Sequence, residues 1–430
     1  MPTIEEKTFK EILSNCELAE KVFGVKADTH YETIERDSFS ALLNDYKTVL
    51  YMTQAMADTL ACMLATCVST KLPGDQLWMR IIGPPGSGKS TLAEAISANK
   101  EYVYPISIFT GIHSGIDEKG SMIPRMQNKT TIIKDADSIM QRDNVETIMS
   151  ELRDIYDRTS RAHYRNAEHR DYENINATFL LCGTDHLRTI DDTHLGERFL
   201  DCEVLDNNFN RDKHLSFVYK SAVANVSLGI GAKNFSERDV QSEKLKRCTA
   251  GYLEYLQQSV SQVNPAVISA VFCERLQSLC KLIAIVRTKI PTDRSNTPLF
   301  RPRGEIPSRL IGQFVKLTLS LCLVFQKKEA DQKIYSIVRK IALDTMDTRG
   351  YNFQLLNLLS KEKQTTRELA LEVNLSDTAT RRKLISLNQI GAVEKAKIQN
   401  PVGQSGRQRD HWSLSPEIHQ LWKSSKLCLN

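Results

Sequence analysis

The clearest chemical signal in the chain is a short glycine-rich run that ends in lysine and serine. Gly83-Pro84-Pro85-Gly86-Ser87-Gly88-Lys89-Ser90 fits the pattern GxxxxGK[ST], and Thr91 continues it. Glycines let backbone N–H groups turn inward around phosphate oxygens, and the start of the following helix adds the positive end of its dipole. Lys89 would reach the β- and γ-phosphates, and the Ser90 hydroxyl would ligate Mg²⁺. These nine residues therefore predict a site for ATP and Mg²⁺.

Two carboxylates follow at the end of an apolar run further along the chain. Asp135 and Asp137 come directly after Thr130-Thr131-Ile132-Ile133-Lys134. Proteins with a phosphate loop hold Mg²⁺ through an acid at such a strand end, so Asp135 is the candidate that shares the metal with Ser90. A second acid normally comes next and activates the attacking water, but here Ala136 stands in that place. Either Asp135 or Asp137 does that work, or hydrolysis is slow.

Two further polar positions complete the candidate catalytic set. Residues 177–182 predict a strand beside the one that precedes the phosphate loop, which would bring Thr184 near the γ-phosphate as a polar sensor. Arg198 lies in Leu195-Gly196-Glu197-Arg198-Phe199-Leu200. An arginine here can reach the γ-phosphate of a neighbouring subunit and stabilise the charge of the transition state. The alternative interpretation is an ordinary surface arginine.

Alternating strands and helices must position these residues. The apolar runs that predict strands are 77–83, 102–108, 130–134 and 177–182. Helical patterns separate them, which indicates an α/β core with a parallel sheet. Residues 38–70 have apolar side chains at helical spacing and no proline or glycine, so they predict one long amphipathic helix before the turn at 72–75.

The remaining pattern divides the chain into four parts. Residues 236–345 are almost wholly helical in pattern, and the segment around residue 347 looks like a boundary. We therefore expect a helical N-terminal segment (1–70), an α/β ATPase core (71–235), a helical lid (236–346) and a C-terminal domain (347–430).

The C-terminal part predicts a winged helix-turn-helix. Three helical patterns are followed by residues 393–399, a polar loop, and a second strand pattern at 411–414. The candidate DNA contacts are Arg381, Arg382 and Lys383 on the third helix and Arg407 and Arg409 in the wing. Residues 351–430 also hold 12 basic and 7 acidic side chains, which favours an anionic partner. Such domains also bind proteins, so a protein partner stays an alternative.

The order of phosphate loop, acidic strand, polar-tipped strand and arginine resembles an AAA+ ATPase. The segment Pro307-Ser308-Arg309-Leu310-Ile311-Gly312-Gln313-Phe314-Val315-Lys316-Leu317 sharpens this, because it is similar to the sensor 2 helix of minichromosome maintenance-type helicases. The resemblance covers about 75–325. It implies that Arg309 contacts ATP across a subunit interface and that Arg198 is that family's interface arginine. The second acid is missing, and Thr184 replaces the usual sensor asparagine. The pattern also resembles AAA+ proteins of phages and other mobile elements.

Two loops are candidates for contact with substrate. In the resembled helicases a β-hairpin at the position of 158–174 points into the channel of the ring. Arg161, Arg165 and Arg170 here, with tyrosines and histidines between them, suit phosphates and stacked bases, although a solvated loop is equally consistent with the acids present. Residues 108–115 contain Phe109-Thr110-Gly111, which resembles the loop by which bacterial enhancer-binding ATPases remodel polymerase. A second channel loop is the alternative.

Composition limits the classes of protein that need to be considered. The chain of 430 residues has 41% hydrophobic and 25% charged residues, which is typical of globular proteins. No apolar run is long enough to span a membrane, and the N-terminus lacks a signal-peptide pattern, so we expect a cytoplasmic location and no membrane partner. The ten cysteines form no CxxC pair, which argues against a zinc site.

These observations favour an ATP-driven DNA motor. The first hypothesis is a homo-oligomer, a ring or open ring with a hexamer as one option, that acts in replication as a helicase or helicase loader of a phage or mobile element. The alternatives are an ATP-gated transcription regulator and a protein-remodelling switch in defence or transposition.

Overall fold

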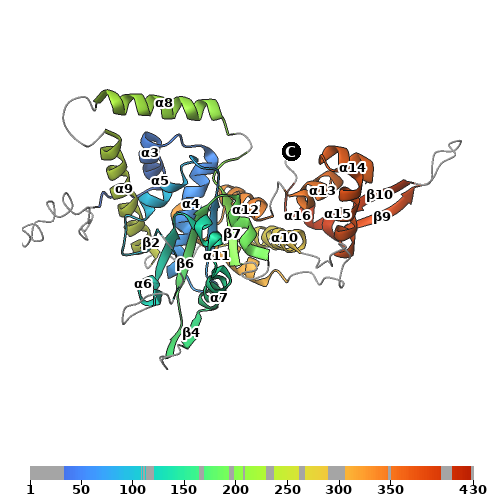
Figure 1. Cartoon of the computed structure of the whole chain (residues 1–430), viewed down its shortest axis with the longest axis horizontal. Coiled ribbons are helices and arrows are strands. Elements are labelled where there is room, and N and C mark those ends of the chain that lie inside the picture. The colour runs from blue at the N-terminus through green and yellow to red at the C-terminus, as the bar shows by residue number, and fades with distance from the viewer. Residues whose placement is uncertain are drawn as a thin grey trace, which may run out of the picture.

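A central sheet of five parallel strands organises the computed structural model of the chain (Figure 1). Its order is β2-β3-β6-β1-β7, and every neighbouring pair is parallel. The strands are β1 (Trp78–Ile82), β2 (Val103–Ile106), β3 (Lys129–Ile133), β6 (Ala177–Gly183) and β7 (Phe199–Glu203). All strands therefore end at one edge of the sheet, the carboxyl edge, and begin at the other, the amino edge.

The structure describes twelve stretches of the chain, and every structural statement below refers to them. They are residues 33–107, 109, 112, 121–163, 169–192, 198–206, 209–228, 237–260, 267–288, 306–346, 350–398 and 409–427.

The four strands expected from apolar runs are confirmed, and one strand was missed. β1 and β6 are buried at every position, as expected for a parallel sheet covered on both faces. The missed strand is β7, whose apolar run is interrupted by Asp201. That carboxylate is 1% exposed and accepts a hydrogen bond of 2.6 Å from Arg80 Nε on β1. Because its charged residue is paired inside the protein, β7 can be buried although its sequence pattern looks polar, and for this reason the pattern did not predict a strand.

The prediction of one long helix over 38–70 is wrong, because the structure has two helices there. They are α3 (Phe39–Val49) and α4 (Gln54–Val68). Leu50 is extended, and the Thr53 side chain accepts the N–H of Met56, so an N-cap starts α4 without proline or glycine. α4 is buried along nearly its whole length and packs against the sheet and the later helices.

Helices cover the two faces of the sheet and form the predicted helical region after it. Those that accompany the sheet are α5 (Lys89–Ile96), α6 (Ile123–Met126) and α7 (Val145–Tyr156), with short 3-10 helices at Ser69–Lys71, Ala136–Gln141 and Asp185–Asp192; α8 (Arg211–Leu228) follows them in the chain and contacts α9. The helical region contains α9 (Glu237–Val260), α10 (Ala270–Arg287), α11 (Ser308–Val324) and α12 (Gln332–Thr345).

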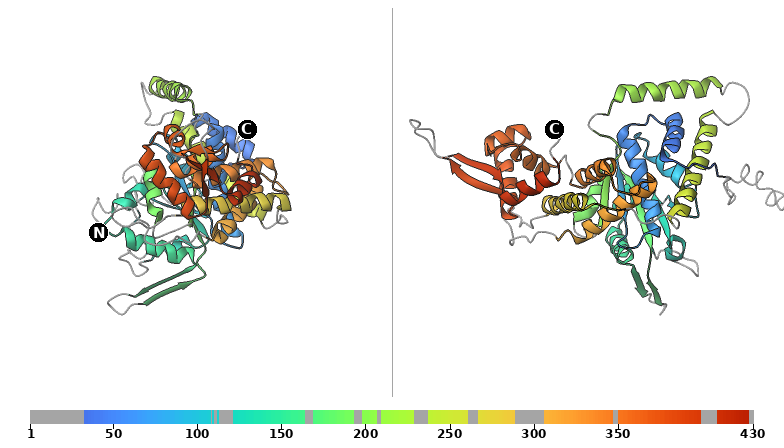
Figure 2. Two further views of the ribbon diagram at one scale, coloured as in Figure 1. Left: turned by 90° about the vertical axis from the view of Figure 1, so that its right-hand side faces the viewer. Right: turned by 180° about the vertical axis from the view of Figure 1, so that it is seen from behind.

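Two elements project from opposite ends of this body. The antiparallel hairpin of β4 (Thr159–His163) and β5 (His169–Glu173) extends from the amino edge, as the resemblance predicts. Helix α8 lies across the other end (Figure 1, Figure 2).

The C-terminal part is a small unit of helices on a three-stranded sheet. Its elements are α13 (Tyr351–Leu359), β8 (Gln364–Thr365), α14 (Thr366–Glu372), α15 (Asp377–Gln389), β9 (Val393–Ile398), β10 (Arg409–Leu414) and α16 (Pro416–Ser424). The sheet order is β8-β10-β9. Thr365 begins α14 with a capping box, and Ser376 caps α15. α16 packs against α10 and joins the unit to the body. None of the described helices is long and apolar enough to cross a membrane.

Candidate nucleotide-binding site

The phosphate loop lies at the carboxyl edge, between β1 and α5. Gly86 and Gly88 have φ values of 78° and 87°, a left-handed conformation that glycine adopts without strain. A Cβ at Gly88 would lie 2.9 Å from the Met56 methyl group and 3.5 Å from the Leu50 side chain. The break between α3 and α4 therefore packs directly on the loop. Sequence reasoning missed this contact because it assumed a continuous helix.

Lys89 points back into the loop that it follows. Its ammonium donates to the carbonyl oxygens of Gly83 at 2.5 Å and Pro84 at 2.9 Å, and to the Ser87 hydroxyl at 3.3 Å. Burial lowers the pKa of Lys89, while Cys182, Asp137 and the exposed Asp185 oppose that shift. The acceptors bound by this ammonium are thus groups of the loop itself, which phosphate oxygens can replace.

The two candidate acids lie in different surroundings. Asp135 is exposed directly after β3. Asp137 turns instead toward the end of β6, where its Oδ2 accepts the backbone N–H of Thr184 at 2.8 Å. Its Oδ1 is buried without a hydrogen-bond partner among the described residues. Asp137 is therefore hydrogen-bonded to the residue that follows β6. Of the two candidate acids, it is the one that opposes the lowering of the Lys89 pKa.

Gly183 makes this approach of Asp137 sterically feasible. A Cβ at Gly183 would lie 2.7 Å from Asp137 Oδ1 and 2.8 Å from the Leu187 side chain, which is closer than real Cβ contacts. The adjacent Asp185 was not in the predicted set, although its place at the end of a predicted strand was a usable signal.

The arrangement fits a nucleoside triphosphate with Mg²⁺. The phosphate loop, with two glycines in the left-handed conformation, and the Lys89 ammonium can bind phosphate oxygens. Ser90 is exposed in the first turn of α5, with Thr91 beside it. Across from them the exposed Asp135 and the unpartnered Oδ1 of Asp137 offer carboxylate oxygens, which Mg²⁺ prefers.

Arg198 and Arg309 lie at the opposite, amino edge of the sheet. Arg198 directly precedes β7, and Arg309 is in the first turn of α11. The two guanidinium groups share one carboxylate: Nη2 of Arg198 lies 2.9 Å from Asp157 Oδ2, and Nη2 of Arg309 lies 3.8 Å from Asp157 Oδ1. Arg198 also stacks over the Tyr156 ring at 5.5 Å. The amino edge thus carries a cluster of charged side chains that is separate from the phosphate loop.

A buried lysine on α11 completes this amino-edge cluster. Lys316 is 3% exposed, and its ammonium has no hydrogen-bond partner within the described part of the chain. Burial lowers its pKa to about 8, repulsion from Arg158 adds to the shift, and Asp75 opposes it. Sequence reasoning noted this residue only within the sensor 2 segment, because burial of a lysine is not visible in a pattern.

The predicted DNA-binding residues are spread over two projecting surfaces. On the hairpin, Arg161 is exposed and forms ion pairs with Asp171 at 3.2 Å and Glu173 at 3.3 Å. Its cation is therefore largely balanced by neighbours on β5. Arg165 lies outside the described residues, as do the side chain of Arg170 and most of the loop 108–115, of which Phe109 and Ile112 are buried.

In the C-terminal unit, Arg381 and Arg382 are exposed on α15. Lys383 lies over the Tyr351 ring at 5.4 Å. Sequence reasoning missed Lys395 and Lys397, which are both exposed on β9; Lys395 pairs with Asp410 at 2.8 Å. Their spacing of two residues on a strand was the available signal. Arg407 and the side chain of Arg409 lie outside the described residues.

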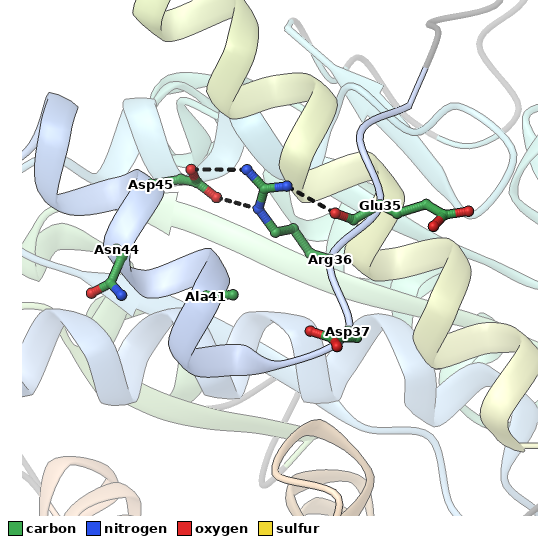
Figure 3. Close-up of a pocket in the computed structure, with 6 residues that line it drawn as sticks. All are labelled: Glu35, Arg36, Asp37, Ala41, Asn44 and Asp45. Atoms are coloured by element: carbon green, nitrogen blue, oxygen red, sulfur yellow. Dashed lines mark hydrogen bonds and ion pairs between the residues drawn. The ribbon is translucent and has the colours of Figure 1, made fainter.

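A surface hollow of about 530 Å³ lies away from these sites, next to α3 (Figure 3). Six residues line it: Glu35, Arg36, Asp37, Ala41, Asn44 and Asp45. The Arg36 guanidinium is bound by both oxygens of Asp45, at 2.6 and 3.1 Å. None of these residues belongs to the phosphate loop or to a strand end, so the hollow is not part of the candidate nucleotide site.

Comparison with known proteins adds no assignment to this geometry. No protein-family model matches the chain, and no curated protein matches it.

Proposed function

We propose that the chain is an oligomeric AAA+ ATPase that acts on DNA, as a helicase or helicase-loader-like factor of a phage or mobile element. The observation that carries this proposal is the separation of two charged centres by the sheet. β1 has five residues at about 3.3 Å each, so roughly 15 Å of strand lies between the two edges. Arg198 and Arg309 therefore suit the nucleotide of a second copy better than their own, which favours a head-to-tail ring or open ring.

Each residue of the candidate site has a role in this proposal. Backbone N–H groups of the loop and Lys89 hold the β- and γ-phosphates, while Ser90 and Asp135 hold Mg²⁺, which supplies charge neutralisation on the phosphates when bound. Asp137, fixed by the Thr184 N–H, orients the attacking water. Arg198 and Arg309 of the adjacent copy stabilise the charge of the transition state.

The helical and C-terminal regions have roles in the same proposal. α9 to α12 form the lid, and the C-terminal unit is a winged helix-turn-helix. α15 enters the major groove with Arg381 and Arg382, while Lys395 and Lys397 contact flanking phosphates. The order of helices and strands and their exposed cations support this assignment.

The decisive experiment measures ATP hydrolysis with and without single- and double-stranded DNA. We expect DNA to raise a rate that Lys89→Ala and Arg198→Ala both abolish, while Lys47→Ala on α3 leaves it unchanged. Replacement of Arg381 and Arg382 by alanine should weaken DNA binding and lower its salt dependence, with Lys423→Ala on α16 as the control. A negligible rate with every DNA would contradict the motor.

One observation favours a second function, an ATP-gated switch in transcription, defence or transposition. Ala136 occupies the place of the usual second acid, and Asp137 is already engaged by the Thr184 N–H. Slow hydrolysis with tight, nucleotide-dependent assembly on DNA or on a partner protein would support the switch over the motor.

A further inference from the structure

Asp157 stands where the two amino-edge arginines converge. It is the C-cap of α7, and each of its two carboxylate oxygens faces a different guanidinium group. Arg198 comes from the start of β7 and Arg309 from the start of α11, so the convergence is made by the fold. A carboxylate between two guanidinium groups occupies the place that two oxygens of a terminal phosphate would take.

The two arginines differ in how open they are to another molecule. The Arg309 side chain is 48% exposed, whereas the Arg198 side chain is 7% exposed and lies between Tyr156 and Asp157. In this conformation Arg198 is therefore covered, and a phosphate that is to bind its Nη2 must displace the Asp157 carboxylate. The Asp157 side chain is 45% exposed, so it has room to turn outward.

The charge of the amino-edge cluster suits a more highly charged occupant than a carboxylate. Its cations are Arg153, Arg158, Arg198, Arg309 and Lys316, and its carboxylates are Asp75, Asp154 and Asp157. The cations are in excess, and the Lys316 ammonium has no hydrogen-bond partner among the described residues. A phosphate carries more negative charge than a carboxylate, so it balances this excess better.

We propose that Asp157 is an internal competitor for the terminal phosphate of a nucleotide held by a second copy of this chain. This inference rests on the proposed function. In the free chain the Asp157 carboxylate holds Arg198 and Arg309 together and covers Arg198. When the neighbour's triphosphate arrives, the guanidinium groups exchange the carboxylate for phosphate oxygens. Asp157 is thus a positioning residue that makes association depend on the triphosphate.

The test compares the protein concentration at which ATP hydrolysis per chain becomes half-maximal. Asp157→Asn keeps the shape of the side chain and removes its charge. We expect that concentration to fall by about two- to tenfold, the range for loss of one competing ion pair, with the maximal rate unchanged. Glu146→Gln in the first turn of the same helix makes the same change in charge but removes no described ion pair, so it should shift the concentration much less.

Two further measurements separate competition from a purely structural role. Association measured by sedimentation should shift in Asp157→Asn with a non-hydrolysable triphosphate but not with ADP. In an Arg198→Ala background, where ATP hydrolysis is not expected, Asp157→Asn should lose most of its effect on association as measured by sedimentation. A lower maximal rate without a change in concentration, an equal shift in Glu146→Gln, or no shift would each overturn the inference. If the wild type hydrolyses no ATP and does not associate, the proposed function fails first and the inference with it.

Discussion

The charged side chains at the two edges of the sheet are bound in different ways. At the carboxyl edge, Lys89 is bound by three acceptors of its own loop, and Asp137 is bound by the N–H of Thr184. At the amino edge, the side chains of Arg198 and Arg309 converge on Asp157, and the Lys316 ammonium finds no hydrogen-bond partner among the described residues. The charged groups of the carboxyl edge are therefore largely satisfied by hydrogen bonds within the chain, while the amino edge has more cations than acids.

This difference shows what each centre is suited to do. Backbone atoms fix the carboxyl edge before any ligand arrives, so it is preorganised for phosphate. The amino edge keeps buried positive charge, which costs stability unless an anion balances it. Such an imbalance is expected at a surface that is completed by another molecule.

The largest expected effect comes from mixing two inactive variants. Lys89→Ala removes the carboxyl-edge cation and Arg309→Ala an amino-edge one, and each alone should lower ATP turnover by about a hundredfold or more. In an equal mixture, about a quarter of head-to-tail interfaces combine an intact loop with intact arginines. Turnover should therefore recover to about a quarter of the wild-type rate. Mixtures that stay inactive would show that the two edges do not meet.

A second comparison divides the roles of the two acids within the carboxyl edge. Asp137→Asn should lower maximal ATP turnover by about a hundredfold at any Mg²⁺ concentration, because it weakens the group that orients water. Asp135→Asn should instead raise the Mg²⁺ concentration needed for half-maximal turnover. Titrating Mg²⁺ against the rate for both variants distinguishes these outcomes, and an exchange of the two behaviours would reverse the assignment.

The excess charge of the amino edge should be visible as a pH dependence of stability. The pKa of Lys316 is about 8 in the folded chain against 10.5 ordinarily. Between these values the unfolded chain binds more protons, so the free energy of unfolding rises with pH across that window. Lys316→Met should stabilise the protein at pH 7 by about 2–3 kcal/mol and flatten this dependence. Denaturant unfolding at several pH values, with Lys328→Met as an exposed control, measures both.

A smaller effect is expected from crowding the carboxyl edge. Gly183→Ala places a methyl group against Asp137 and Leu187, and we expect it to cost about 1–3 kcal/mol and to reduce ATP turnover. Gly74→Ala is the control for a loss of stability alone: its Cβ meets no atom within 4 Å, its φ of 97° costs about 1–2 kcal/mol, and it should leave ATP turnover unchanged. Thermal unfolding and ATP turnover are measured for both variants. Equal losses of turnover in the two variants would mean that Asp137 tolerates displacement.

Local patterns predicted most of the sheet but only one of its two charged edges. β1, β3 and β6 are mostly apolar runs, interrupted by Arg80 in β1 and by threonines in β3 and β6, with glycine or acid at or just after their ends, so both strands and strand ends were readable. β7 was missed because Asp201 is matched by a residue 121 positions away. Likewise, nothing near Asp157 indicates that Arg198 and Arg309 converge on it. Such contacts depend on how elements pack, which spacing along the chain does not encode.

The order of the strands has a consequence for synthesis of the chain on the ribosome. β1 lies between β6 and β7, yet Arg80 on β1 is made 121 positions before its partner Asp201. At about 5–20 residues per second, this leaves β1 without its β7 neighbour for roughly 6–24 s, and β6 is made only shortly before β7. An apolar strand with two open sides is prone to aggregate. α4 is made just before β1 and packs on it, so we expect this helix to cover one face of the nascent strand until the sheet closes.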